Sequence, residues 1–119
     1  MNHFDAVIIG SGQAAPSLAV GLANRGQSVA LIEGDKLGGT CVNSGCTPTK
    51  TLRKSARVAH MVRRAEDFGV STGAVTVDFP AAMARMRERV DTARRGLTAW
   101  LKRTKGVEVI HGWGSLAGF

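Results

Sequence analysis

The chain has 119 residues, a formal net charge of +7 and two cysteines. This length suits one domain with a modest core, and it contains no apolar run long enough to cross a bilayer. The first residues lead directly into the apolar stretch 6–9 without a basic segment or a cleavage site, so we expect no signal peptide, no membrane association and a cytoplasmic location.

The first 33 residues predict a strand–helix–strand unit. Residues 5–10 form a continuous apolar, β-branched run, which is typical of a buried parallel strand. Residues 16–25 have helical spacing and are followed by a glycine, as helix ends often are. Residues 28–33 predict a second buried strand. Together they predict a right-handed parallel βαβ unit, and therefore an α/β fold of the Rossmann-like type.

The turn between the first strand and the helix has the pattern Gly10-x-Gly12-x-x-Ala15. Gly10 permits a tight turn, Gly12 lets the backbone approach a pyrophosphate, and Ala15 keeps the helix close to the sheet. Glu33 ends the second strand, where a carboxylate can accept hydrogen bonds from the ribose hydroxyls of an adenosine. The pattern predicts a site for FAD or NAD; the alternative is a tight turn without a ligand.

The second half predicts two helices and a terminal strand. Thr47 as N-cap and Pro48 in the first turn predict a helix that runs to about residue 65 after a glycine-rich loop, 34–45. Residues 70–77 predict a connection that could include a short strand. Asp78 precedes a long amphipathic helix that ends at Gly106 and lies on a core or a partner. Its apolar positions are Phe79, Met83, Met86, Val90, Ala93, Leu97 and Trp100. Residues 107–111 predict a strand, and 112–119 a turn into a further strand.

The two cysteines, Cys41 and Cys46, allow three interpretations: a structural disulfide, half of a metal site or a redox pair. A structural disulfide is disfavoured in the cytoplasm, where thiols are kept reduced. Zinc usually requires four ligands, and the three histidines lack ligand-like spacing, so we expect no metal site. A helix start beside Cys46, with Lys50 in its first turn, favours the thiolate that disulfide exchange requires. The neighbouring Gly39 lets the backbone approach a ligand.

The stretch Gly38-Gly-Thr-Cys-Val-Asn-Ser-Gly-Cys-Thr-Pro-Thr-Lys50 resembles the redox-active disulfide signature of the FAD-dependent pyridine nucleotide–disulfide oxidoreductases. Glutathione reductase, dihydrolipoyl dehydrogenase and mercuric reductase are members. The first strand, the glycine turn, Glu33 and the cysteine loop come in the family's order, and the resemblance covers the whole chain. The residues of the cysteine motif are most similar to those of mercuric reductases, although Ser44 and Thr47 stand where many relatives have small aliphatic residues.

The resemblance implies a role for individual residues. Cys41 matches the interchange cysteine that attacks the substrate, Cys46 the cysteine next to the flavin, and Lys50 a lysine beside the flavin ring. Gly114 matches a backbone contact to adenine. The implied FAD-binding residues are Gly10, Gly12, Ala15, Glu33, Gly39, Thr40, Lys50 and Gly114.

The resemblance also implies an activity. NAD(P)H would reduce the flavin, the flavin the disulfide, and the dithiol a substrate, for which we expect mercuric ion, with a lipoamide- or glutathione-type disulfide as the alternative. Full-length relatives are homodimers with a second FAD motif, an NAD(P)H domain and a dimerisation domain. We therefore expect residues 1–119 to form the N-terminal part of an FAD-binding domain, inactive alone and binding FAD weakly or not at all.

Two other classes of function remain open. The helix 79–100 could make the chain an interaction module that pairs with another protein. A basic surface could bind nucleic acid, although a basic piece of a larger protein would have the same charge. The residues of that surface are Arg53, Lys54, Arg57, Arg63, Arg64 and the basic positions after Arg85.

Overall fold

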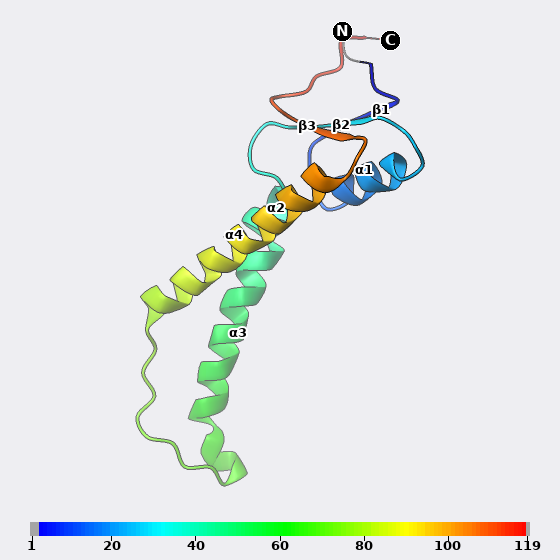
Figure 1. Ribbon diagram of the computed structural model, residues 1–119. Coiled ribbons are helices and arrows are strands. Elements are labelled where there is room, and N and C mark those ends of the chain that lie inside the picture. Colours follow the sequence, from blue (N-terminus) through cyan, green and yellow to red (C-terminus); the bar gives the residue numbers. More distant parts are fainter. Residues whose placement is uncertain (1–2, 119) are drawn as a thin grey trace.

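The computed structural model describes residues 3–118 and has at its centre a three-stranded parallel sheet. The strands are β1 (Ala6–Ile9), β2 (Val29–Glu33) and β3 (Val107–His111), in the order β1-β2-β3 (Figure 1). In register, Val29 of β2 lies between Ala6 of β1 and Val107 of β3. The apolar run of β2 is buried because this strand is central, and the expected α/β fold is confirmed.

One face of the sheet is covered by α1 (Ala15–Ala23) and by the end of α4 (Phe79–Arg103). Ala19 of α1, Leu31 of β2 and Leu101 of α4 are fully buried between these layers. On the edge strand β1, Val7 and Ile9 alternate with the more buried Ala6 and Ile8 and stay about half exposed. The core therefore lies between the sheet and the two helices.

The cysteine segment, residues 38–46, folds differently from the expected loop, 34–45. A short helix, α2 (Gly39–Asn43), follows Gly38, and α3 (Cys46–Arg63) begins after only two intervening residues, Ser44 and Gly45. The predicted N-cap Thr47 is wrong, because Gly45 occupies the cap position and its carbonyl accepts from the Thr49 N–H at 3.1 Å. The helical turn therefore starts earlier, and Cys46 is its first residue.

Helices α3 and α4 extend side by side away from the sheet, joined at their far ends by η1 (Ala65–Phe68) and residues 69–78 (Figure 1). The molecule is accordingly elongated, with extents of 67 × 26 × 22 Å. The predicted start of α4 is confirmed, since Asp78 Oδ1 accepts from the Ala81 N–H at 2.9 Å. None of the helices described in residues 3–118 is both long and apolar enough to cross a membrane.

The predicted apolar face of α4 is only partly correct. Val90 is buried as expected, but Phe79 and Trp100 are 64% and 39% exposed, and Leu101 occupies the core instead. A straight α-helix drifts by about 20° per heptad relative to a seven-residue repeat. Over the 25 residues of α4 this drift carries Trp100 away from the sheet and brings Leu101 onto it.

The two further strands that the sequence suggests are absent from the described residues. Residues 70–77 form an irregular connection, and so do residues 113–118; Phe119 lies outside the described part of the chain. Gly112 and Gly118 have positive φ, which breaks the extended backbone on either side of that last segment. The described sheet therefore ends with β3.

Candidate active site

The glycine turn lies between β1 and α1, at the carboxyl end of the sheet. Gly10 has φ of 90°, a left-handed conformation that favours glycine, and its N–H donates to the Ile32 carbonyl of β2 at 2.7 Å. Helix α1 then begins at Ala15, and no side chain caps its N-terminus. A side chain built on Gly12 would meet no atom within 4 Å, so the space beside it is open. The turn thus offers a bare backbone and a free helix N-terminus.

Ser11 joins three segments beneath this turn. Its side chain is 1% exposed, and its hydroxyl donates to Glu33 Oε2 while accepting from the Gly38 N–H at 3.0 Å. The Ser11 N–H also donates to Glu33 Oε2, at 2.9 Å. The ends of β1 and β2 and the start of the cysteine segment are therefore held together by one buried hydroxyl. Sequence reasoning missed Ser11, because the pattern Gly10-x-Gly12 specifies no residue type at its position.

Glu33 is held as a carboxylate. The Ser11 hydroxyl, followed by the N–H groups of Asp35, Ser11 and Gly34, lowers the pKa of this carboxyl below its ordinary value, against the opposing effect of burial. The Asp35 N–H donates to Glu33 Oε1 at 3.0 Å. An ionised carboxyl only accepts hydrogen bonds, and its two oxygens can accept several at once. Three of the roughly four acceptor sites of Glu33 are already used, so the carboxylate can still accept from one hydroxyl group, at Oε1.

The cysteine segment passes directly over the glycine turn. A Cβ atom built on Gly39 would lie 2.9 Å from the Cα of Gly12, a distance that real Cβ contacts do not reach. Gly39 also has φ of 59°. Glycine is required at this position both by its conformation and by the approach of the two backbones. The contact brings the start of α2 against the dinucleotide-type turn.

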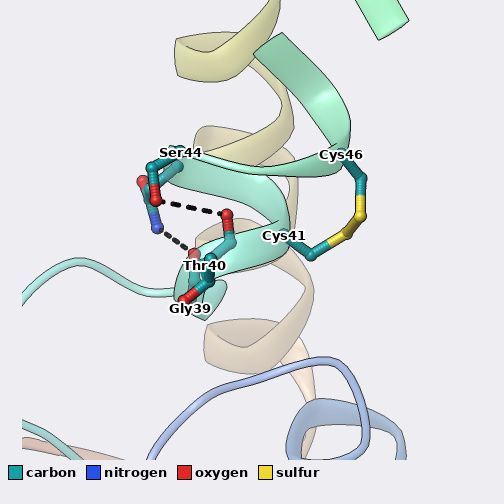
Figure 2. The surroundings of a disulfide bond; sticks show 6 residues. Gly39, Thr40, Cys41, Ser44 and Cys46 are labelled. Atoms are coloured by element: carbon teal, nitrogen blue, oxygen red, sulfur yellow. Dashed lines mark hydrogen bonds between the residues drawn. A yellow bond between two sulfur atoms is a disulfide. The ribbon is translucent and has the colours of Figure 1, made fainter. Parts of the chain in front are cut away.

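Cys41 in α2 and Cys46 at the start of α3 are joined by a disulfide bond, with their Cα atoms 4.6 Å apart (Figure 2). The chain between them turns sharply, and the Ser44 N–H donates to the Thr40 carbonyl at 2.9 Å. A Cβ on Gly45 would approach that same carbonyl oxygen to 3.0 Å, so the turn needs a glycine for space. The Thr40 carbonyl therefore stabilises the turn that brings Cys41 and Cys46 together.

Lys50 lies one helical turn beyond Cys46, on the exposed side of α3. It begins a basic stripe, Lys50, Arg53, Lys54 and Arg57, whose side chains line one small surface hollow. These cations have no ion-pair partner among the described residues, where the two ion pairs are Arg64–Asp67 and Arg94–Asp91. The disulfide end of α3 is thus strongly positive.

The segment after β3 returns across the carboxyl end of the sheet. Trp113 lies against Gly34, and Gly114 lies against Ile9, since a Cβ on Gly114 would meet that side chain at 3.1 Å. Gly114 is therefore close to the end of β1 and to the glycine turn that follows it. The structure brings together at this edge the predicted residues Gly10, Gly12, Ala15, Glu33, Gly39 and Gly114.

These residues fit the adenine half of a dinucleotide. The open space beside Gly12 and the uncapped N-terminus of α1 suit a pyrophosphate, which binds helix N-termini through free N–H groups. The ionised Glu33 suits a ribose hydroxyl. The arrangement defines a nucleotide-binding α/β unit in which the helix that carries Cys41 begins against the glycine turn.

Comparisons with known proteins agree with this class. The profile of the family described as "Pyridine nucleotide-disulphide oxidoreductase" matches residues 4–118, and the chain belongs to this family. It is 39% identical over 114 residues to a dihydrolipoyl dehydrogenase of Chlamydia pneumoniae, covering 96% of this chain and 24% of that protein. It is 36% identical over 116 residues to a dihydrolipoyl dehydrogenase of Bacillus subtilis (strain 168), covering 98% of this chain and 24% of that protein.

A solved structure shows the same fold. The Cu(II) complex of the HOCl-induced flavoprotein disulfide reductase RclA from Escherichia coli superimposes with a TM-score of 0.75 and 37% identity, over 98% of this chain and 23% of that one. The chain spans about a quarter of the length of the relatives it matches. Membership in the family implies FAD as cofactor.

Proposed function

We propose that this chain forms the adenine-binding and disulfide-bearing part of an FAD-dependent disulfide reductase. The observation that supports the proposal is the contact between Gly39 and Gly12, by which the start of the cysteine segment lies on the glycine turn. A structural disulfide would not need this position. The open turn, the ionised Glu33 and the basic end of α3 support the same interpretation.

Each residue would act through a property already described. The backbone of Gly10 to Ala15 would bind the pyrophosphate, and Glu33 would accept a hydrogen bond from the ribose. When bound and reduced by NAD(P)H, FAD would supply the electron pair that opens the disulfide. Cys41 would then exchange with the substrate, while Cys46, at the N-terminus of α3, would remain as a thiolate stabilised by the helix dipole. Lys50 and Thr40 would lie beside the flavin, and Gly114 beside the adenine.

For the substrate we propose a lipoyl-type disulfide in place of mercuric ion. The cysteine motif by itself favours mercuric ion, but the relatives named above are dihydrolipoyl dehydrogenases and a flavoprotein disulfide reductase. Thiol–disulfide exchange also needs only the groups that the Cys41–Cys46 pair provides. We further propose that the whole protein is a cytoplasmic homodimer in which these 119 residues are part of the FAD-binding domain.

The nucleotide-binding half of the proposal is tested by titrating the purified chain with FAD and with FMN, which has the same ring system and lacks the adenosine. We expect weak but saturable FAD binding and roughly tenfold weaker binding of FMN, because FMN lacks the second phosphate and the ribose that the glycine turn and Glu33 would bind. Glu33→Gln should weaken FAD binding part of the way to the level of FMN, because the pyrophosphate contacts of the glycine turn remain, whereas the exposed control Glu88→Gln should leave FAD binding unchanged. Equal affinity for FAD and FMN would overturn the proposal.

The substrate is tested with the dithiol form of the chain. Mixed anaerobically with lipoamide, it should return to the disulfide and release one equivalent of dihydrolipoamide. With photoreduced FAD and Hg(II), the chain should bind the metal ion without releasing elemental mercury above the protein-free control. Release of elemental mercury that depends on Cys41 and Cys46 would instead favour mercuric ion as the substrate.

A further inference from the structure

Asn43, the last residue of α2, uses its side-chain amide to hold the segment that leads into this helix. Its Nδ2 group donates to the carbonyl oxygens of Leu37 and Gly39 at 3.0 Å each, and to that of Lys36 at 3.3 Å. The Asn43 side chain, two residues after Cys41, thus binds three backbone carbonyls that precede Cys41. This pattern fixes the orientation of the amide, with Oδ1 pointing away from the loop.

Arg94 of α4 occupies that free side. One of its guanidinium nitrogens donates to Asn43 Oδ1 at 3.2 Å, across 51 residues of sequence, and another pairs with Asp91 on its own helix. The Arg94 side chain is only 27% exposed. Among the described residues, the Arg94–Asn43 bond is the side-chain hydrogen bond that joins α4 to α2. Helix α4 is itself held in the core by the buried Leu101.

The position of α2 depends on such anchors, because a helix of five residues is far too short to be stable alone. In the oxidised protein the disulfide itself ties Cys41 to α3. When the disulfide is reduced, this covalent link is lost. The hydrogen bonds of Asn43 and Arg94 then remain, together with the Ser44–Thr40 and Gly38–Ser11 bonds, to hold Cys41 beside Cys46.

We propose that Arg94 is a positioning residue that, through Asn43, keeps Cys41 within reach of Cys46 in the dithiol state. The proposal rests on the redox role given above to the cysteine pair. A Cys41 thiol that is fixed in place has a high effective concentration relative to the Cys46 thiol, and this favours re-formation of the disulfide. Loss of the anchor lowers that effective concentration, so the disulfide becomes easier to reduce.

The quantity that reports this effect is the equilibrium with glutathione. Two glutathione thiols give up two electrons and two protons to the Cys41–Cys46 bond, which breaks to two protein thiols as one glutathione disulfide forms. The equilibrium constant for protein oxidation is the effective concentration of the two thiols. It is measured on the full chain by alkylating free thiols at a series of glutathione ratios and counting them by mass.

Arg94→Met should lower this constant about threefold to tenfold, which equals a rise in reduction potential of about 14 to 30 mV at 29.6 mV per tenfold. Arg95→Met is the matched control, because Arg95 is exposed and donates only to Thr92 on its own helix. This control should leave the constant within about twofold of the original, a margin set by the usual size of surface substitutions. Equal values for Arg94→Met and Arg95→Met would overturn the proposal.

Two further variants separate positioning from general stability. Arg94→Lys can still donate to Asn43 Oδ1 and should restore most of the constant, and Arg94→Met should have no effect in an Asn43→Ala background. An unchanged effect in that background contradicts the proposal, and if Asn43→Ala does not fold, the lysine variant decides. The glutathione equilibrium needs no flavin, so a failure of FAD binding would refute the proposed function without altering this result.

Discussion

The buried hydroxyl of Ser11 donates a hydrogen bond to the carboxylate of Glu33, across the gap between the ends of β1 and β2. The same hydroxyl accepts from the Gly38 N–H at 3.0 Å. One small side chain therefore sets the position of the Glu33 carboxylate, for which we propose ribose binding, and of the cysteine segment together. The two motifs that the sequence analysis treats separately form one structural unit at this point.

Ser11→Ala should destabilise the fold by about 1 to 3 kcal/mol, because it leaves the Gly38 N–H without its buried acceptor and removes one of the two hydrogen bonds from residue 11 to Glu33 Oε2. The measurement is urea-induced unfolding of the purified chain. Ser71→Ala, in the exposed connection before α4, is the matched control and should change the free energy of unfolding by less than about 0.5 kcal/mol. If both serine variants unfold alike, Ser11 does not join the two segments.

Glu33 should make stability depend on pH. Its folded-state pKa is lowered by the Ser11 hydroxyl and the nearby N–H groups, so between the folded and unfolded pKa values the unfolded chain binds more protons. The contribution is present above the unfolded glutamate pKa of about 4.3 and is lost as the pH falls through the lower folded value. Urea unfolding from pH 7 to pH 3 should show a shallower loss in Glu33→Gln than in the original. Parallel pH profiles would contradict this.

Gly39→Ala should destabilise the protein by about 1 to 3 kcal/mol, because alanine is strained at positive φ and its Cβ would collide with the Gly12 backbone. FAD binding should weaken in the same variant, since the collision displaces the turn that would hold the pyrophosphate. Gly73→Ala is the control, because Gly73 lies in open space without positive φ. A Gly39→Ala protein as stable as Gly73→Ala would show that the two backbones do not touch.

Asp78→Ala should cost about 1 kcal/mol by removing the N-cap of α4. Its carboxylate accepts from the Ala81 N–H, and the long α3–α4 hairpin has few buried side chains to compensate. Thermal unfolding followed by circular dichroism measures the loss, and Asp78→Asn should retain most of the stability because asparagine also caps helices. An asparagine variant as unstable as the alanine variant would argue against capping as the cause.

The features predicted from sequence are those set by short-range rules. The parallel strands, the start of α4 at Asp78 and the turn at Gly10 follow from apolar runs, a capping residue and glycine spacing. The start of α3 could not be predicted, because it depends on the disulfide turn around Gly45 rather than on Thr47. Ser11, Asn43 and Arg94 were missed because the bonds that join them to other segments span 22 to 51 residues, and no local pattern marks such bonds.

The central claim is that the glycine turn and Glu33 deliver a flavin to the Cys41–Cys46 disulfide. The most direct measurement is the anaerobic rate at which photoreduced FAD reduces this disulfide, compared with photoreduced FMN at equal concentration. We expect the FAD rate to saturate, to exceed the FMN rate and to fall when ADP, the adenine half alone, is added. Equal rates for the two flavins, with no effect of ADP, would contradict the claim.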